Sequence, residues 1–447
     1  MALYWLKSFM NSSLMPTSSF VSQRRFLPLF WVQFLGAFND NLYKNAMVML
    51  IAFQLSLSPE QTGLYITLAA GLFILPFFLF SSIAGQLADH FPKSILIRKI
   101  KLLEILIMAT GAVGFLSLHI EWLFVALFLM GTQSAFFGPI KYSILPEVLQ
   151  DDELLRGNAL FSGSTFMAIL LGTIAGGTGI MLDNGVQIIS GLVVLFAVLG
   201  YGASLWVPET QLASVKVRID KNIARSTWQI VHSSRGFKEA FFAVLAISWF
   251  WFIGAVLLSQ IPSFVKYSLH ANEQVVVAFL TVFSVGIAIG AAMASLFFKR
   301  HLTLRFHPWF LVSMSVFLLL SVAVAELVDG TGLSGDTAVI SLSAFLSLWP
   351  QNLSLLFMFA LALVGGAYIV PLYTQLQIKT PAASRARMIA VNNILNALLM
   401  VLSSILIMVG FSFDMSLSSM LLILGVFNLL MAGWFVRNVR SHNEVVI

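Results

Sequence analysis

The predicted fold depends on one stretch, Phe34-Leu-Gly-Ala-Phe-Asn-Asp40-Asn-Leu-Tyr-Lys44-Asn45. The stretch lies inside an apolar run, residues 28–53, that holds no other charged side chain. At a rise of about 1.5 Å per residue, a helix that begins at residue 28 carries Asp40 about 18 Å into a hydrocarbon core of about 30 Å. A charge at that depth costs from about 3 to above 10 kcal/mol unless it faces a polar interior. The sequence therefore predicts a helical membrane bundle with a polar patch inside it.

The composition of the whole chain is that of a polytopic membrane protein. Of the 447 residues, 59% are hydrophobic and 10% are charged, whereas soluble domains carry about 25% charged residues. The chain contains no cysteine, which excludes disulfides and thiolate chemistry. The net charge of +6 comes from basic residues in short connections between apolar runs. That placement indicates membrane topology and argues against a nucleic-acid partner.

Twelve apolar runs reach the length of about 20 residues that a helix needs to cross a bilayer. Of the 25 lysines and arginines, 23 lie in the N-terminal segment, the even-numbered connections or the C-terminal segment, and the exceptions are Lys44 and Lys266. This excess of positive charge on one side predicts that both termini are cytoplasmic. The predicted spans are residues 28–53, 63–83, 101–119, 122–141, 159–181, 187–207, 239–262, 273–298, 307–328, 352–377, 387–410 and 416–436.

A long basic connection divides the predicted spans into six and six. It is expected to be a solvated linker that also lies on anionic lipid headgroups. The predicted organisation is a cytoplasmic segment at 1–27, a six-helix half at 28–207, the linker at 208–238, a second six-helix half at 239–436 and a cytoplasmic tail at 437–447.

A weak internal repeat supports two related halves. Residues 34–38, Phe-Leu-Gly-Ala-Phe, recur as Phe-Ile-Gly-Ala-Val at 252–256, and residues 131–139 are echoed at 365–371. Asn158 has a counterpart in Asn392. Parallel halves of six helices are the architecture of the major facilitator superfamily, whose substrate sites lie between the halves. The second half has Leu-Leu-Ser at 257–259 where the first has Asn-Asp-Asn, so the membrane charge belongs to the first half alone.

The connection after the second predicted span resembles the cytoplasmic loop signature of that superfamily. It reads Gly85-Gln-Leu-Ala-Asp89-His-Phe-Pro-Lys93. A carboxylate there accepts hydrogen bonds from backbone N–H groups and from basic side chains, which suggests a conformational latch that breaks and forms as the halves rock. The alternative is an aspartate that caps a helix. The predicted latch residues are Gly85, Asp89, Lys93, Arg98, Arg156, Arg385 and Arg387.

Three stretches resemble the lysophospholipid transporter family within the superfamily. They are Phe-Asn-Asp-Asn-Leu-Tyr-Lys at 38–44, Gly-Pro-Ile-Lys-Tyr-Ser-Ile-Leu-Pro-Glu at 138–147, and Leu-Arg-Gly-Asn-Ala at 155–159. The stretch Ser-Trp-Phe-Trp-Phe-Ile-Gly-Ala at 248–255 is more similar to relatives fused to acyltransferase and acyl-carrier-protein synthetase domains. The resemblance implies inward flipping of lysophospholipids, chiefly lysophosphatidylethanolamine, across the bacterial inner membrane for reacylation. It also implies an acyltransferase/acyl-carrier-protein synthetase as a possible partner.

One departure from this family affects the expected headgroup site. Stand-alone relatives tend to carry an arginine in the seventh helix, and residues 249–260 contain none. If that arginine binds phosphate in the relatives, another group must do so in this chain.

Asp40 and Lys44 are the first candidates for binding the substrate. They lie four apart and share a helix face, so they form either a self-neutralising pair that helps packing or a patch that holds a charged group, and intramembrane ionisable groups favour the patch. The carboxylate suits an ammonium and the lysine a phosphate. Lys141 is either a second group that binds the phosphate or a membrane anchor. The other candidates are amides, which serve equally well as contacts between helices: Asn39, Asn41, Asn45, Gln133, Gln260, Asn392, Asn393 and Asn396.

Two other functions remain open. One is a proton-coupled exporter of lipophilic drugs, and the other is a membrane scaffold that docks an acyltransferase without transporting anything. Because Asp40 is predicted to be the only carboxylate near the bilayer centre and Lys44 should keep it ionised, we expect facilitated flipping without proton coupling. An enzyme is not expected, because no nucleophile–base pair, metal-ligand spacing or phosphate-binding loop is found. We expect a monomer with no metal and no cofactor.

Overall fold

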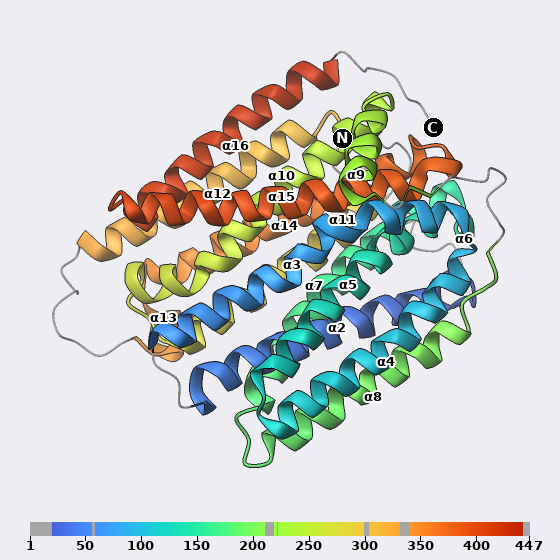
Figure 1. Cartoon of the computed structure of the whole chain (residues 1–447). Coiled ribbons are helices and arrows are strands. Elements are labelled where there is room, and N and C mark those ends of the chain that lie inside the picture. Colours follow the sequence, from blue (N-terminus) through green and yellow to red (C-terminus); the bar gives the residue numbers. More distant parts are fainter. Residues whose placement is uncertain are drawn as a thin grey trace.

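The computed structural model describes residues 20–55, 59–210, 219–220, 222–298, 304–330 and 340–440. Most of the predicted N-terminal segment and of the tail, and part of the linker, therefore lie outside the described residues. Within them, twelve long helices form one bundle (Figure 1). This confirms the all-α polytopic fold that the sequence predicts.

The first six long helices are α2 (Leu27–Met49), α3 (Pro59–His90), α4 (Lys93–Ser117), α5 (Ile120–Ser143), α7 (Asp151–Gly179) and α8 (Gly185–Leu205). The second six are α10 (Lys238–Ser263), α11 (Glu273–Phe297), α12 (His307–Gly330), α14 (Gln351–Ile378), α15 (Arg385–Ser412) and α16 (Leu417–Arg440). The short element η1 (Phe20–Ser22) precedes α2. The other short elements lie between long helices, namely η2 (Leu50–Gln54), α6 (Leu145–Val148), α9 (Ile223–Ser234), η3 (Phe264–Ser268), α13 (Leu342–Ser347) and η4 (Ala382–Ser384).

Eleven of the described helices are long and apolar enough to cross a membrane, and α2 is not among them. Its polar residues lower its hydropathy, yet α2 packs along α7 and α8. Gly172 and Gly176 of α7 make this contact close, because a Cβ at either position would overlap the carbonyl oxygen of Phe38 or Leu42. Small residues allow such backbone approach between membrane helices. Packing against the bundle therefore compensates for the polar sequence of α2.

The same helix pairings recur in the two sets of six. In the first set α2 packs on α7, α3 on α5 and α4 on α8, and in the second α10 packs on α15, α11 on α14 and α12 on α16. The two sets meet where α3 and α5 contact α15, and where α7 contacts α11 and α14. This arrangement agrees with the weak sequence repeat, although the predicted domain boundaries remain a prediction.

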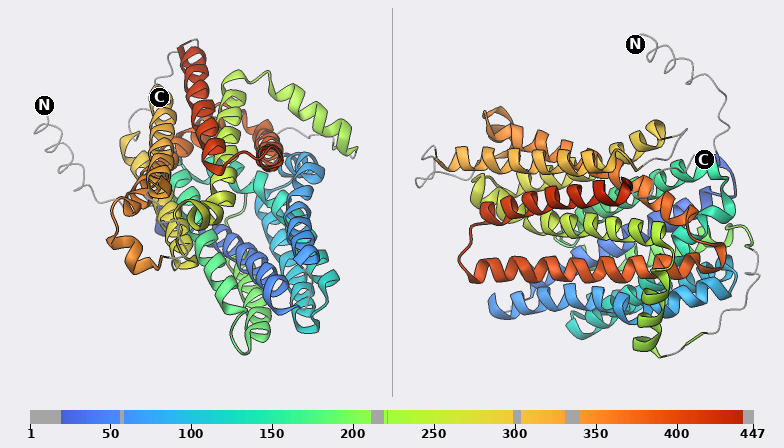
Figure 2. Two further views of the ribbon diagram at one scale, coloured as in Figure 1. Left: turned by 90° about the vertical axis from the view of Figure 1, so that its left-hand side faces the viewer. Right: turned by 90° about the horizontal axis from the view of Figure 1, so that it is seen from above.

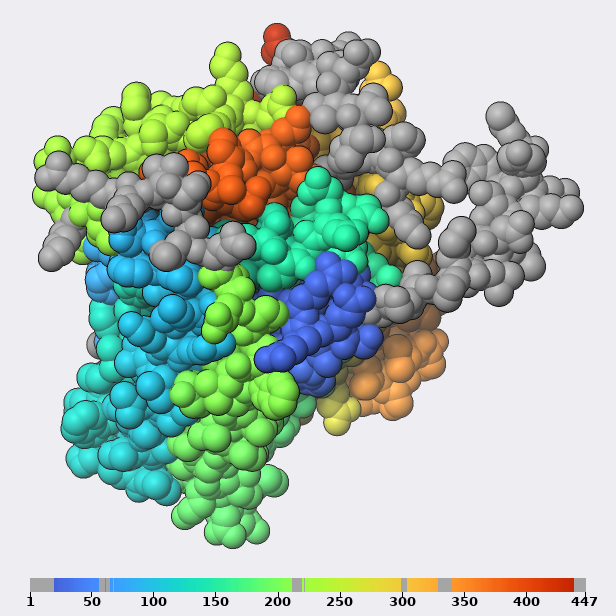
Figure 3. Space-filling model, turned by 90° about the vertical axis from the view of Figure 1, so that its right-hand side faces the viewer, coloured from blue at the N-terminus to red at the C-terminus, as the bar shows by residue number. Residues whose placement is uncertain are grey.

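The helix α9 lies outside this pattern. Figure 2 shows it running across the direction of the long helices, near the end of the bundle where α2 begins and α16 ends. The distribution of basic residues assigns that end to the cytoplasm. Figure 3 views this end and shows the segment around the start of α15 lying directly against neighbouring elements of the first six helices.

Candidate functional site

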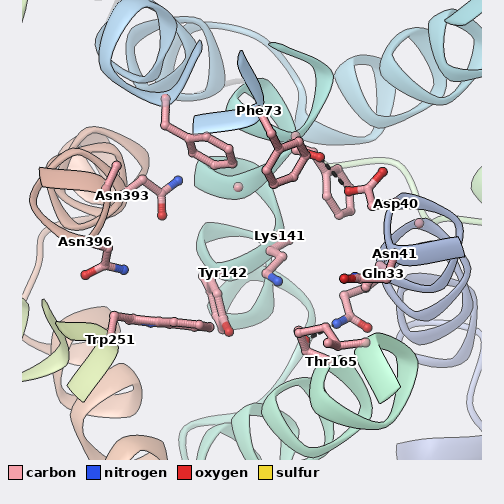
Figure 4. A pocket seen from close by; sticks show the side chains of 18 of the residues that line it. Gln33, Asp40, Asn41, Phe73, Lys141, Tyr142, Thr165, Trp251, Asn393 and Asn396 are labelled. Carbon is pink, nitrogen blue, oxygen red and sulfur yellow. Dashed lines mark hydrogen bonds between the residues drawn. The ribbon is translucent and has the colours of Figure 1, made fainter. Parts of the chain in front are cut away.

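A cavity of about 290 Å³ lies between the two sets of helices. Residues of α2, α3, α4, α5 and α7 line one side, and residues of α10, α14 and α15 line the other. Figure 4 shows Lys141 in the middle, with Asp40 and Asn41 on one side and Asn393 and Asn396 on the other. This position, between the halves, is where the sequence predicts the substrate site.

Asp40 and Lys44 both line the cavity, but each has a different direct partner. Asp40 Oδ2 accepts a hydrogen bond of 2.8 Å from Ser134 Oγ. Lys44 Nζ lies 4.5 Å from the centre of the Phe73 ring. Asp40 and Lys44, both described in the structure, form no direct ion pair with each other. A direct self-neutralising pair is therefore not what the structure contains. Both groups are placed at the cavity wall.

Lys141 also lines the cavity, with Nζ 4.9 Å from the centre of the Tyr142 ring. A lysine in contact with an aromatic face gains a cation–π attraction. The sequence places Lys141 at the end of a span, as either a site residue or an anchor, whereas α5 continues to Ser143. Its place in the cavity favours the first of these roles.

Lys101 and Glu104 are site residues that the sequence reading missed. Lys101 Nζ donates to Glu104 Oε2 at 2.6 Å, both side chains are 1% exposed, and Lys101 lines the cavity. Gln133 Nε2 donates to the same carboxylate at 2.9 Å. The predicted span began at residue 101, but α4 begins at Lys93, so both charges lie well inside a helix. Gln133 is adjacent to Ser134, the partner of Asp40, so Glu104 lies beside Asp40. The prediction that Asp40 is the only carboxylate near the bilayer centre is therefore wrong.

The charges of this site all come from the first half. Three ammonium groups face two carboxylates, and Lys101 is neutralised directly by Glu104. The second half contributes amides, aromatic rings and aliphatic side chains to the lining. Its polar contributors at this wall include Asn393, Asn396 and Tyr373. The cavity thus has a charged side and a neutral side, which suits a ligand with one charged end and one apolar end.

Among the predicted amides, Asn41, Gln133, Asn393 and Asn396 line the cavity. Asn41 Nδ2 donates to Ala37 O at 2.8 Å, and Asn396 Oδ1 accepts from Ser248 Oγ at 2.7 Å. Each amide retains further hydrogen-bonding capacity, because a side-chain amide has two donors and two acceptor positions. These residues are therefore placed to contact a ligand.

The other predicted amides do not line the cavity. Asn39 Nδ2 donates to Val193 O of α8 at 3.0 Å, and Asn45 Nδ2 donates to Thr173 Oγ1 of α7 at 3.1 Å. Gln260 lies in a separate small hollow within the second half, and Asn392 is fully buried in contact with Tyr373. Asn39 and Asn45 thus hold helices together. The assignment of all four residues to substrate binding stays a prediction.

Trp251 lies at the wall that α10 contributes, the helix in which relatives tend to have an arginine. Its indole Nε1 donates to Tyr373 Oη at 3.3 Å, and its ring stacks on Phe166 with centres 5.9 Å apart. Tyr373 in turn stacks on Tyr142 at 4.2 Å. These aromatic rings, which the sequence analysis did not select, connect the two halves beside Lys141 (Figure 4).

The predicted latch centres on Asp89, at the cytoplasmic end of α3. Its Oδ1 accepts from Ala386 N at 2.9 Å, and its Oδ2 accepts from Arg387 N at 3.1 Å and from Arg387 Nε at 2.9 Å. Gly85, one turn earlier, lies so close to α15 that a Cβ there would be 2.7 Å from Ala390 Cβ. Asp89 therefore pairs with a basic residue and also caps a helix, but the capped helix, α15, belongs to the other half.

The remaining predicted latch residues have other partners. Lys93 forms an ion pair with Glu147, and Arg98 Nη2 donates to Val207 O at 3.2 Å. Arg156 lies 5.6 Å from the centre of the Phe20 ring. Arg385 Nε donates to Gln377 O at 3.0 Å. Of the predicted partners, only Arg387 forms a direct hydrogen bond with Asp89 in the described part of the chain.

A second contact joins the halves at the same end. Asn158 Nδ2 donates to Gln377 Oε1 at 2.6 Å and to Thr374 Oγ1 at 3.1 Å, and Gln377 Nε2 donates to Tyr142 O at 2.8 Å. Asn158 lies in the cytoplasmic part of α7, and Gln377 lies near the cytoplasmic end of α14. The hydrogen bonds that directly connect described residues of the two halves thus gather on the cytoplasmic side. These bonds close the molecule on that side.

Two matching sets of six helices around a central cavity, closed at one end, define a secondary transporter of the alternating-access type. Within residues that the structure describes, no group of three or more His, Cys, Asp or Glu side chains could hold a metal ion. The sequence profile of the Major Facilitator Superfamily matches residues 29–404. The chain belongs to this superfamily.

Two similar proteins of known name are bacterial transporters. Lysophospholipid transporter LplT of Serratia proteamaculans is 27% identical over 388 residues, which cover 82% of this chain and 83% of that protein. Lysophospholipid transporter LplT of Escherichia fergusonii is 28% identical over 267 residues, which cover 59% of this chain and 64% of that protein, less than two thirds of its length. The chain is accordingly a multi-pass inner-membrane protein.

Solved structures share the fold at low sequence identity. The Escherichia coli fucose:proton symporter is 14% identical, with a TM-score of 0.64 over 94% of this chain and 98% of that chain. A bacterial homologue of the iron transporter ferroportin, in an outward-facing state, is 15% identical, with a TM-score of 0.63 over 92% of this chain and 99% of that chain. These similarities establish the superfamily fold.

Proposed function

We propose that this chain carries lysophospholipids across the bacterial inner membrane by alternating access. The names of the similar transporters point to this substrate class. The observation that carries the proposal is the division of the cavity into a charged side and a neutral side. A lysophospholipid is divided in the same way, because it joins a charged headgroup to a single acyl chain.

The charged side suits a zwitterionic headgroup. Asp40 has one oxygen bonded to Ser134 and the other, Oδ1, without a hydrogen-bond partner among the described residues, so it can accept from an ammonium. Lys44 and Lys141 touch aromatic rings and lack a direct carboxylate partner in the described chain, so they can meet a phosphate. Charge-assisted hydrogen bonds of this kind are about twice as strong as neutral ones. Lys141 then takes the part that an arginine of the seventh helix would take in relatives.

The neutral side suits the acyl chain. Trp251, Ile369, Ala397 and Met400 of the second half line the cavity opposite the lysines. Methionine and aromatic side chains give apolar walls that adapt to a flexible chain. A lipid bound this way has its headgroup on α2, α4 and α5 and its tail on α10, α14 and α15.

The closed cytoplasmic side fits uptake from the outer leaflet. Contacts of Asp89 and Asn158 must break before the lipid leaves on the inner side, where reacylation by an acyltransferase/acyl-carrier-protein synthetase follows. We propose that the chain acts as a monomer, without an enzymatic step of its own. Flipping is facilitated rather than coupled to protons, so lysolipid uptake should persist when a protonophore is added. Uptake that collapses with the protonophore would favour a proton-coupled exporter.

The test is flipping of labelled lysophosphatidylethanolamine in sealed proteoliposomes. Asp40→Asn keeps the shape of the side chain but removes its charge, and Lys141→Gln removes the proposed phosphate partner. Each lost charge-assisted contact is worth about 1.5–3 kcal/mol, so each variant should slow flipping by at least about 10-fold. Asp183→Asn, in an exposed turn, is the matched control and should flip at the wild-type rate. Undiminished flipping by both site variants would refute the proposed function.

A further inference from the structure

The helix α9, in the linker between the halves, has one face held by the bundle. Asn222 caps it, with Oδ1 accepting from Arg225 N at 3.0 Å. Ser226, Ile230 and Ser234 are spaced by four residues and are buried, which places them on the side that meets α3 and α15. The linker, which the sequence predicts to be solvated and to lie on anionic lipid headgroups, contains a helix that touches both halves.

This buried face is fixed to α3 by hydrogen bonds. Ser226 Oγ contacts Ser82 Oγ and accepts from Gln86 Nε2 at 2.6 Å. Gln86 Oε1 accepts from Asp220 N at 2.8 Å, just before the helix begins. Gln86 lies one residue after Gly85 and three before Asp89 on the same helix. The position of α9 is therefore tied to the segment that forms the cytoplasmic latch.

A cavity of about 440 Å³ lies beside α9 and extends to the latch. Its lining includes Gln86, Ser226 and His232, and also Arg387, the partner of Asp89. Asp220 lies at its edge, 3.6 Å from Arg225. Polar groups and both signs of charge are thus present where α9, α3 and α15 meet.

The outer face of α9 has the residues of a helix at a membrane surface. Trp228 is 70% exposed, and its ring stacks on His232 with centres 6.3 Å apart. Arg225 and Arg235 are exposed beside it. Because α9 lies across the long helices near their cytoplasmic ends (Figure 2), this face meets the level of the lipid headgroups, where tryptophan and basic residues are favoured.

We propose that α9 binds the anionic phospholipids of the cytoplasmic leaflet and that this binding holds the latch closed. Anionic headgroups are the proposed ligand of this face, because its exposed charges are positive. The position of α9 across the cytoplasmic ends of the long helices also places this face next to the bilayer surface. Lipid binding fixes α9, α9 is bonded to α3 beside Asp89, and α9 also packs on α15. The membrane surface thereby favours the cytoplasm-closed state.

The first measurement tests whether Trp228 enters the bilayer. The full chain is reconstituted in vesicles of equal parts phosphatidylcholine and brominated phosphatidylglycerol, and tryptophan quenching is compared between the wild type and Trp228→Phe. We expect the variant to lose a strongly quenched component. Identical quenched fractions would place Trp228 in water, as expected for a surface that binds a soluble protein, and would overturn the proposal.

The second measurement tests the effect on the latch. Because the chain has no native cysteine, spin labels on Gln150→Cys and Ala382→Cys report the separation of the halves at the cytoplasmic end. Replacing phosphatidylcholine by the mixture with phosphatidylglycerol should raise the closed-to-open ratio, by up to about 30-fold if each of two arginines contributes fully. Arg225→Gln with Arg235→Gln should abolish the rise. An equal ratio in both lipids for the wild type would refute the coupling.

Two further variants separate binding from coupling. Lys99→Gln with Arg437→Gln removes the same charge from exposed positions elsewhere on the bundle and should keep the lipid effect. Ser226→Ala should keep the quenching of Trp228 but weaken the lipid effect on the latch, since it removes the side-chain link to Gln86 and leaves only the bond from Asp220 N. An undiminished lipid effect in Ser226→Ala, or one that disappears in the lysine–arginine control, would contradict the proposed route. None of these measurements uses a lysophospholipid, so they stand or fall separately from the proposed function.

Discussion

Asp89→Asn tests whether the contact between α3 and α15 holds the cytoplasmic side closed. The aspartate side chain is fully buried and accepts three hydrogen bonds from the first turn of α15. Asparagine has nearly the same shape, but only one of its two terminal groups is an acceptor. It can keep the bond from Ala386 N, and it loses the charge and both bonds from Arg387.

The expected cost follows from these bonds. A hydrogen bond that involves a charged group contributes about 1.5–3 kcal/mol, and a negative charge at a helix N-terminus adds about 0.3–1 kcal/mol. Because water partly replaces these bonds in the open state, we expect Asp89→Asn to destabilise the closed form relative to the open form by about 3 kcal/mol. At about 1.4 kcal/mol per factor of ten, the closed-to-open ratio should fall by about 150-fold.

Spin-label distances on the two sides of the membrane measure this ratio. The pair Gln150→Cys and Ala382→Cys lies at the cytoplasmic end, and the pair Asn184→Cys and Ser416→Cys lies at the opposite end, all at exposed positions. In Asp89→Asn the cytoplasmic distances should lengthen while the opposite pair shortens, because the halves rock as units.

The matched control is Asp152→Asn, an exposed aspartate in the first turn of α7. It lies at the same end of the molecule and should leave both distance distributions unchanged. If Asp89→Asn folds and its distributions coincide with the wild type on both sides, the hydrogen bonds to α15 do not set the conformational equilibrium, and the reasoning is wrong.

Two other predictions concern the close contacts of α3 and the buried charges of α4. Gly85→Val should also lengthen the cytoplasmic distances, because a side chain there meets the backbone of α15 at 3.0 Å, whereas Gly71→Val on the same helix, with no atom within 4 Å of its Cβ, should not; equal effects would contradict this. Lys101→Met leaves Glu104 without its 2.6 Å partner and should destabilise the protein by about 3–5 kcal/mol, seen as a lower thermal midpoint in detergent. Lys101→Met with Glu104→Gln should recover most of the loss, and a double variant no more stable than the single one would show that the unpaired charge is not the cause.

The fold was predictable because its signals are local. Hydropathy identified twelve spans, and all twelve are long helices in the described structure. The cost of burying a charge singled out Asp40, and the structure places it at the central cavity. Each of these inferences needs only the residues of one segment and the known thickness of a bilayer.

The missed charges in α4 show where local signals mislead. The predicted span begins at residue 101, directly after Arg98 and Lys99, and Lys101 is counted with the cytoplasmic charges. The helix instead begins at Lys93, and Lys101 turns inward to Glu104 three residues later. The spacing of opposite charges by three residues was the available sign, since such pairs meet on one helix face.

The amides of α2 show a second limit. Successive residues of a helix point about 100° apart, so Asn39, Asp40 and Asn41 cannot all face one cavity. The structure turns Asn39 to α8. The sequence also offered five basic partners for Asp89 and could not select Arg387 among them, because the choice depends on the register between segments almost 300 residues apart.

The one-sided placement of charge has a consequence for the movement itself. The charged residues at the cavity all belong to the first half and move with it: Asp40, Lys44, Lys101, Glu104 and Lys141. When the halves rock, none of these cavity charges has to leave one counter-charge and find another across the moving boundary, whereas Asp89 at the latch has to release Arg387. The polar end of a bound ligand can stay in contact with the first half throughout, and only the apolar wall of the second half moves relative to it. That movement requires no exact fit at any stage.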